Sequence, residues 1–281
     1  MYDAACPCNP VQLQRAQGDL RVSLKRRGSA TVLDGLRQAG CLKVRLPRPV
    51  TDGWIDVVTL NTSGGVAAGD RLDAVFDLQS GTHATIAAQA AERFYRSAQG
   101  SAPAQVRTRI VVADDAAAEW LPQETILFDR CAMDRRLDIE LADTARFTGV
   151  ETLVFGRTAM GERVQEARLR DLIRVRRGGR LLLHDAVRMD GCVDALLQHA
   201  PVANGARAVA TVLHVAPDAE RRVDALRTAL LHADAECGVS AWDGMLVTRM
   251  LAASAAELRQ TIIATLAILR DARPLPRVWQ C

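Results

Sequence analysis

Histidine and cysteine, the side chains that hold transition metals most tightly, are few in this sequence and lie far apart. The 281 residues include five histidines and seven cysteines, with no Cys-x-x-Cys pair and no two histidines at ligand spacing. The sequence therefore predicts no tight zinc site of the usual tetrahedral kind. Cys6 and Cys8 are the one local pair of thiols. Two interpretations of that pair stay open, a soft-metal ligand pair and a free N-terminal segment.

The most distinctive segment is a glycine-rich stretch over residues 61–71, which reads NTSGGVAAGDR. A glycine-rich loop can cradle a phosphate group when a helix follows it and points its free amides at the anion. Here no Gly-Lys-Ser/Thr triplet occurs, and the next residues alternate in hydropathy with a period of two, as in a strand. A phosphate site is therefore the weaker interpretation. The glycines are expected to turn the backbone sharply and to set Asp70 and Arg71 at a loop tip.

Two further segments combine aromatic side chains with charged ones. Residues 90–97 place Phe94 and Tyr95 between charges, and residues 120–128 begin with Trp120 and mix aromatics, proline and a carboxylate. Aromatic and arginine side chains dominate protein-binding hot spots, and aromatics are only 4% of this chain. Both segments are therefore candidates for partner contacts, with burial in a sheet core as the alternative.

The sequence contains no recognisable enzyme mechanism. No Ser/His/Asp or Cys/His arrangement stands out along the chain. A β-rich hydrolase with two catalytic carboxylates is the enzymatic alternative, and it would need two acids roughly 5–10 Å apart in a sugar-sized cleft.

Most of the chain up to about residue 207 alternates apolar and polar side chains with a period of two. One set is Leu72, Ala74, Phe76 and Leu78, and similar sets lie at 20–24, 42–46, 84–88, 106–112, 137–141 and 169–175. This pattern predicts strands with one face in the core. A Gly-Gly pair at 178–179 predicts a tight hairpin turn. So many strands without helices between them favour layered antiparallel sheets over a doubly wound fold.

The chain from residue 208 onward has the character of an α+β section. Asp218 is the expected N-cap of a first helix. Ser254 and Glu257 are spaced as a capping box at the start of a second helix, since each side chain can satisfy a free backbone donor of the other residue. The expected order is a strand over 209–215, a helix to about 230, strands near 239–242 and 245–251, and a helix to about 269. This order resembles a split β-α-β unit.

Length and composition describe a globular protein. Hydrophobic residues make up 49% and charged residues 25%, and the net charge is only +3, so we expect no nucleic-acid and no membrane partner. No secretion signal or membrane-spanning run is evident, and the scattered cysteines fit reduced thiols in the cytoplasm. We expect a flexible extension over 1–17, a β-rich core over 18–207, and the α+β section over 208–281 packed on the same globular unit.

Five segments together resemble the motif series of the urease accessory protein D family, which is also called H (UreD/UreH). They are residues 61–71, 90–97 and 120–128, FGRTAMGE at 155–162 and LPRVW at 275–279, and they occur in the family's order. The resemblance spans residues 60 to 279, whereas the first 17 residues match no motif of the family. Ala68, where the family often has glycine, and the final Cys281 are departures from the pattern.

The resemblance implies a mainly β fold whose strands wind into stacked, β-helix-like sheet layers with few helices. It also implies a non-catalytic accessory role in metallocentre assembly, with binding to apo-urease and to two other accessory proteins, F and the GTP-hydrolysing G. Family members are thought to guide Ni²⁺ from the G protein through an internal passage. We therefore expect transient Ni²⁺ and no tightly bound cofactor.

A conduit for an ion has to bind it well enough to remove part of its water and weakly enough to release it onward. Carboxylates bind nickel more loosely than imidazole and thiolate groups do. Acidic residues within or close to the family motifs are the candidates for such a passage, and a surface salt bridge with an arginine is the alternative for each. The candidates are Asp70, Glu124, Asp129, Glu151 and Glu162.

Exposed aromatic and arginine side chains in the same motifs are the candidates for partner binding. They are Arg71, Phe94, Tyr95, Arg96, Trp120 and Trp279. A protein that only holds urease and never contacts the metal is the competing hypothesis. The two differ in whether urease activation depends on the carboxylates when complex assembly is intact.

Overall fold

A computed structural model of the protein describes residues 14–49, 51–157 and 160–280. Residues 1–13 of the expected N-terminal extension lie outside this description, as do Cys6, Cys8 and Cys281. The first strand begins at Gln17, and the Arg71 backbone N–H donates to the Ala16 carbonyl oxygen at 3.0 Å. The first strand therefore includes Gln17, the last residue of the expected extension.

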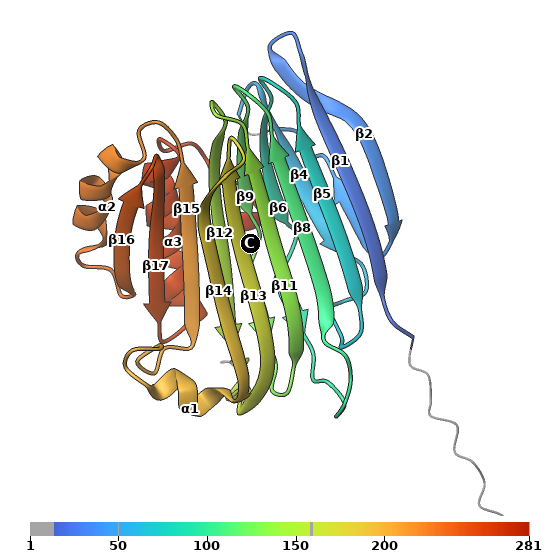
Figure 1. Ribbon diagram of the computed structural model, residues 1–281, viewed down its shortest axis with the longest axis vertical. Coiled ribbons are helices and arrows are strands. Elements are labelled where there is room, and N and C mark those ends of the chain that lie inside the picture. The colour runs from blue at the N-terminus through green and yellow to red at the C-terminus, as the bar shows by residue number, and fades with distance from the viewer. Residues whose placement is uncertain (1–13, 50, 158–159, 281) are drawn as a thin grey trace, which may run out of the picture.

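Two large sheets face each other and make the protein mainly β, as expected (Figure 1). Sheet A contains, in spatial order, β14 (Arg180–Cys192), β13 (Glu166–Arg177), β11 (Ala132–Leu141), β8 (Ala104–Val112), β5 (Arg71–Leu78), β1 (Gln17–Arg27) and β2 (Ala30–Gly40). Sheet B contains β16 (Glu236–Trp242), β17 (Met245–Ala252), β15 (Ala208–Val215), β12 (Arg146–Phe155), β9 (Ala117–Leu121), β6 (His83–Ala88), β4 (Trp54–Asn61) and β3 (Leu42–Arg45). The short strands β7 (Glu92–Phe94) and β10 (Thr125–Leu127) extend sheet B beside β12.

The chain winds between the two sheets through the middle of the molecule. From β4 to β13 the longer strands alternate between sheet B and sheet A, so that neighbours within a sheet run parallel. The expected β-helix-like layers are therefore confirmed. The expected antiparallel pairing holds only toward the sheet edges, in pairs such as β1–β2, β13–β14 and β15–β17. Parallel pairing follows from the winding, because each full turn returns the chain to the same sheet in the same direction.

The α+β section continues sheet B and does not form a separate body, since β12 pairs with β15 along its length. The helices α2 (Val223–Leu230) and α3 (Ala255–Leu269) pack on the outer face of sheet B (Figure 1). The order β15–α2–β16, with antiparallel β17 between the two strands, is the predicted split β-α-β unit. The six-residue helix α1 (Val193–Gln198) was not predicted, because it is too short to show a hydrophobic period.

Local signals were accurate at most of the predicted boundaries. The capping box at the start of α3 is present, with the Ser254 side chain accepting from the Glu257 backbone N–H. The hairpin between β13 and β14 turns at Gly178 and Gly179, both at positive φ. The prediction for Asp218 was wrong, because its carboxylate pairs with Arg222 and the helix α2 has no side-chain cap. A short 3₁₀ turn, η2 (Glu220–Arg222), precedes α2, and a second, η3 (Arg277–Trp279), lies near the C-terminus.

Three apolar clusters make up the core. The first lies between the sheets and includes Phe76, Ile110 and Phe147. The second fills the space between sheet B and the helices α2 and α3. The third lies between the sheets toward the opposite end of the strands and includes Phe94 and Phe155. The two clusters between the sheets leave a band of polar side chains between them, and the candidate site lies in that band.

Candidate functional site

Three charged side chains interrupt the inward-facing apolar pattern in the middle of both sheets. On β11, Arg135 stands between the core residues Met133 and Leu137 at positions that point to one face. On β13, Asp171 likewise stands between Leu169 and Ile173. The third charged residue, Glu151, lies on β12 of the opposite sheet. We call these three residues, Arg135, Glu151 and Asp171, the polar layer.

The guanidinium of Arg135 joins the two carboxylates of the polar layer. Its Nε and Nη2 donate to Oδ1 and Oδ2 of Asp171 at 2.9 and 2.5 Å, which is a bidentate pair. Its Nη1 lies 2.6 Å from Oε2 of Glu151 and also donates to Oγ1 of Thr125 at 2.9 Å. All three charged side chains are at least about nine-tenths buried, with side-chain exposures of 11%, 9% and 9%.

The electrostatics of the polar layer favour a cation. Burial raises the pKa of Glu151, Arg135 lowers it, and the neighbouring Asp171 raises it again, with a net upward shift. Burial lowers the pKa of Arg135, but the two carboxylates more than offset this and raise it overall. Two carboxylates around one guanidinium carry one excess negative charge when all are ionised.

Two cavities adjoin the polar layer, and both are lined by Arg135 and Glu151. The larger, of about 240 Å³, also contacts Asn61, Glu92, Thr108 and Trp120. The smaller, of about 30 Å³, is lined further by Asp171, Asp185 and Thr211. The interior between the sheets is therefore hollow on both sides of these charged residues.

Two more acids extend the polar band beyond the polar layer. Glu92 lines the larger cavity, where burial raises its pKa and the Asn61 Nδ2 donates to it at 3.1 Å. Asp185 lines the smaller cavity and pairs with Arg249 at 3.0 Å. Acids from β7, β12, β13 and β14 thus line the two adjoining cavities in the interior, and only Glu151 among them was a predicted site residue.

Asp70 lies outside this band and holds the glycine-rich loop together. It is buried, and its two carboxylate oxygens accept the backbone N–H groups of Ala16 and Ala67 at 2.8 and 2.7 Å. The expected turn is present, but the expected solvated loop tip is not. Arg71 is exposed at the start of β5, and that strand confirms that no phosphate-binding helix follows the loop.

The remaining candidate carboxylates lie near the ends of strands in ion pairs. Asp129 accepts the Gln165 and Glu166 backbone N–H groups at 2.8 and 3.1 Å. Glu162 pairs with Arg157 at 2.7 Å, which lowers the pKa of Glu162, and it also accepts the Asp129 backbone N–H at 3.4 Å. Asp129 and Glu162 are therefore neighbours.

Glu124 is separate from that pair and lies 3.6 Å from Arg259. It does not line the larger cavity, although its chain neighbours Gln123 and Thr125 do.

Several residues predicted to contact partners are buried in this structure, contrary to the exposure on which that prediction rests. Phe94 is 2% exposed in the third core cluster, and Trp279 is 6% exposed in the second. The Trp279 Nε1 donates to the Leu121 carbonyl oxygen at 2.9 Å, while Arg259 stacks on its ring at 4.8 Å. Trp120 points between the sheets and packs on Phe76. Aromatics at these positions build the core, because sequence spacing alone does not reveal which face of a strand is covered.

Tyr95 is half-buried, and its chain neighbour Arg96 is exposed. The Tyr95 hydroxyl donates to the Gly64 carbonyl oxygen at 2.6 Å, and its ring meets Phe128 edge-on at 5.1 Å. Arg96 is exposed and lines an open groove of about 680 Å³ with Arg130 and Arg168. The groove also contains Glu166 and Asp190. Its three arginine side chains are exposed.

Ligands that would hold a metal tightly are absent from the described residues. Among residues 14–49, 51–157 and 160–280, no group of three histidine, cysteine, aspartate or glutamate side chains could hold a metal ion. The four cysteines described there are free. Burial raises the pKa of the Cys131 thiol to about 12, so it stays protonated near neutral pH and is a poor metal ligand.

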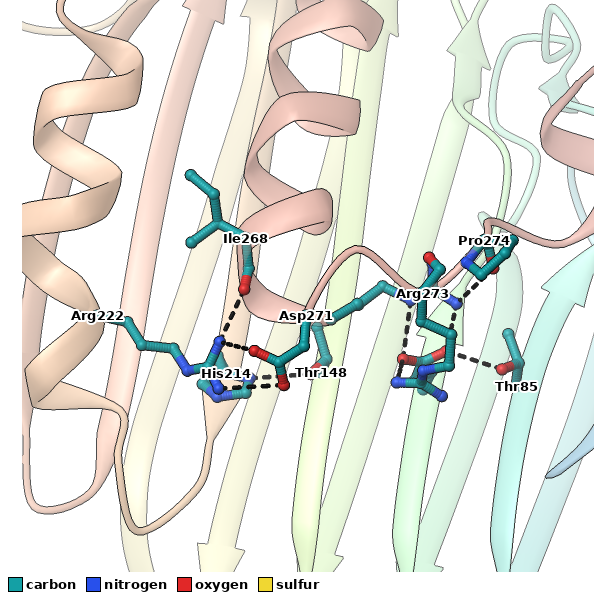
Figure 2. Close-up of polar contacts among 10 residues, drawn as sticks. Thr85, Thr148, His214, Arg222, Ile268, Asp271, Arg273 and Pro274 are labelled. Carbon is teal, nitrogen blue, oxygen red and sulfur yellow. Dashed lines mark hydrogen bonds and ion pairs between the residues drawn. The ribbon is translucent and has the colours of Figure 1, made fainter. Parts of the chain in front are cut away.

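The loop after α3 is fixed to the outer face of sheet B by a buried ionic cluster. Glu119 on β9 accepts hydrogen bonds from Arg270 Nε at 2.8 Å, Arg273 Nη2 at 2.6 Å and Thr85 Oγ1 at 2.7 Å. Figure 2 shows Arg273 and Pro274 near Thr85, and it shows Asp271 of the same loop paired with Arg222, which belongs to η2. This cluster fixes to sheet B the loop that leads to the C-terminal motif. No helix in the described part of the chain is long and apolar enough to cross a bilayer.

Comparison with known proteins identifies the family. The model of the UreD urease accessory protein family matches residues 16–280. A urease accessory protein UreD 2 of Methylorubrum populi is 43% identical over 273 residues, covering 95% of this chain and 91% of its own. Accessory proteins UreD of Xanthobacter autotrophicus and Azorhizobium caulinodans are 43% and 42% identical, each covering 95% of this chain and 90% and 97% of their own. The chain therefore belongs to the UreD family of urease accessory proteins, and it is an accessory protein and not an enzyme.

Proposed function

We propose that this protein takes part in urease maturation by guiding Ni²⁺ between its two sheets, across the polar layer, toward apo-urease. Its partners in this role are apo-urease and the accessory proteins F and G, and its compartment is the cytoplasm. The proposal combines the family membership with one structural observation. A buried carboxylate, Glu151, lines two cavities on either side of a band of acids.

The chemistry of the band suits an ion in transit. Carboxylate oxygens and water bind Ni²⁺ more loosely than thiolate or imidazole groups do. The acids Glu92, Glu151 and Asp171 lie on different strands, so that an ion would meet them one after another. Because each carboxylate binds the ion only weakly, the ion can leave one position and move on to the next. Asp70, Glu124, Asp129 and Glu162 are not among the cavity-lining residues, and on this proposal they affect the passage less than Glu151 does.

The second candidate function is a docking platform that never touches metal. The open groove with Arg96, Arg130 and Arg168 favours it, because arginine forks grip the carboxylates of a partner. The two candidates differ in how urease activation responds to a change inside the protein. A docking platform depends on its surface and not on Glu151.

The test replaces Glu151 by Gln, which keeps the size and removes the charge. We expect the complex with F, G and apo-urease to assemble normally and urease activity to fall severalfold after activation with nickel. Glu140→Gln is the matched control, because Glu140 lies on the outer face of β11 and pairs with Arg109. Full activation by a folded, assembled Glu151→Gln protein would refute nickel guidance and leave the docking platform.

A further inference from the structure

Arg135 lies between the two cavities of the interior. Both cavities between the sheets are lined by this side chain and by Glu151. On one side lies about 240 Å³ of space, and on the other about 30 Å³ beside Asp171 and Asp185. The guanidinium therefore forms a wall shared by the two cavities.

The same guanidinium occupies the position that a passing cation would prefer. It makes a bidentate pair with Asp171 and contacts Glu151 at 2.6 Å, so it uses the carboxylates that a divalent ion would use. With Arg135 in place the three groups carry one excess negative charge when both carboxyl groups are ionised. Without it, two carboxylates would match the charge of one divalent ion.

We propose that Arg135 is a movable cationic gate, which closes the connection between the two cavities and yields its carboxylates to a divalent cation in transit. This inference rests on the proposed function, and it describes how the movement of the ion between the two cavities is regulated. The gate prevents the two acids from trapping the ion, because the returning guanidinium competes for both carboxylates and displaces it. During passage the divalent ion and the guanidinium of Arg135 therefore exchange places, while Glu151 and Asp171 remain the ligands of whichever cation is bound.

The structure offers the side chain a place to go. Arg135 already borders the larger cavity, whose volume of about 240 Å³ adjoins its guanidinium. The Glu92 carboxylate lines the same cavity and is a second acceptor for a displaced guanidinium. Glu92 receives hydrogen bonds from Asn61 Nδ2 at 3.1 Å and from the Arg93 backbone N–H at 3.2 Å. Movement toward Glu92 would keep the arginine paired while the other two acids are free.

The first test measures Ni²⁺ binding to the full chain by titration calorimetry. Arg135→Gln should bind Ni²⁺ more tightly than the unsubstituted protein by about tenfold or more, since a competing unit charge is removed from a site of reduced dielectric. The triple variant Arg135→Gln/Glu151→Gln/Asp171→Asn should lose this gain. Arg174→Gln is the matched control, because Arg174 pairs with Asp138 on the outer face of the same sheet. Equal Ni²⁺ affinity of folded Arg135→Gln and the unsubstituted protein would overturn the gate.

A milder variant covers the case in which Arg135→Gln does not fold. Arg135→Lys keeps the charge but replaces the planar fork with a single ammonium, which cannot pair bidentately with Asp171 and also reach Glu151. Its Ni²⁺ affinity should also exceed that of the unsubstituted protein, and an unchanged affinity would contradict the gate. If Glu151→Gln lowers urease activation while neither Arg135 variant gains Ni²⁺ affinity, the gate fails and the proposed function stands. If Glu151→Gln leaves activation unchanged, the proposed function itself fails.

Discussion

The indole Nε1 of Trp120 donates a hydrogen bond to the Oε1 of Glu151 at 2.7 Å, between the two sheets. The sequence suggested different roles for these residues, a partner contact for Trp120 and an ion ligand for Glu151. In the structure they form one unit on the neighbouring strands β9 and β12. The indole fixes the carboxylate toward the cavities and leaves its other oxygen, Oε2, to Arg135.

Removal of the indole donor should weaken the fold. Trp120→Phe keeps most of the ring but leaves the buried Glu151 with one donor fewer, and we expect a loss of about 1–3 kcal/mol in the free energy of unfolding. Urea unfolding monitored by circular dichroism measures this loss. Trp242→Phe is the control, since the Trp242 indole is partly exposed and its bond to the Leu182 carbonyl oxygen is longer, at 3.3 Å. Equal losses in the two variants would contradict a special role for the Trp120 bond.

The ionic cluster behind α3 should be costly to break from one side only. Glu119→Gln leaves the guanidinium of Arg270, which is 2% exposed, without its carboxylate, and we expect a loss of about 3–5 kcal/mol in unfolding free energy. The double variant Glu119→Gln/Arg270→Met should lose less than the sum of the single changes, because the buried Arg270 charge is gone and only Arg273 is left without its carboxylate. Glu140→Gln, which breaks the exposed pair with Arg109, serves as the reference. It should lower the free energy of unfolding by no more than about 1 kcal/mol. Strict additivity of the two Glu119 and Arg270 changes would show that the pair is not coupled.

His214 should make the fold sensitive to mild acid. Burial lowers its pKa from 6.5 to about 4, and its Nδ1 shares a hydrogen bond with the Thr148 hydroxyl at 2.9 Å. Below pH 6.5 the unfolded chain therefore takes up a proton that the folded chain refuses until about pH 4. Stability that is complete above pH 6.5 should fall as the pH drops, by about 2–3 kcal/mol near pH 4.5.

Denaturant unfolding at a series of pH values checks this dependence. His214→Gln should remove the contribution of His214 to the slope of unfolding free energy against pH between pH 6.5 and 4.5. His232→Gln, a change at an exposed histidine, should leave this slope unchanged. A His214→Gln slope equal to that of the unsubstituted protein would mean that His214 does not contribute.

The effect of a substitution on partner binding should depend on whether the side chain is exposed and not on whether it is aromatic. Arg96→Glu should weaken capture of the partner proteins and leave the melting temperature unchanged, because Arg96 is exposed at the groove. Trp279→Ala should instead lower unfolding free energy by about 3–5 kcal/mol, the usual cost of truncating a buried aromatic. Pull-down and thermal melting on the same samples separate the two effects. Normal stability of Trp279→Ala together with lost capture would restore the tail as a binding surface.

Much of the fold could be predicted, because strand alternation and helix caps are local signals. The alternating sets, the hairpin turn at Gly178 and the capping box at Ser254 each fix structure within a few residues. Parallel pairing could not be predicted in this way, since it depends on how the chain winds between sheets. The winding depends on contacts between strands that are two or three apart in chain order.

The site was partly encoded in the same alternation. Asp171 occupies an inward position of the pattern that contains Leu169, Ile173 and Val175, so the sequence already placed a charge in the core. Arg135 does the same two residues before Leu137. A charged residue at an inward strand position was the sequence signal that could have identified the polar layer. The location of a residue within a family motif was a weaker signal. The burial of Trp279 had no such signal, because it depends on contacts with Leu121 and Arg259, which are distant in the sequence.

The most direct test of nickel passage between the sheets is to fill the larger cavity without changing any charge. Ala88 lines that cavity at the end of β6, and Ala88→Phe would occupy its space. The measurement is the nickel content of urease after activation by the assembled complex, with Ala39→Phe on the exposed strand β2 as the control. We predict a severalfold lower nickel content for Ala88→Phe with assembly intact. A nickel content equal to that of the control would contradict passage through the protein interior.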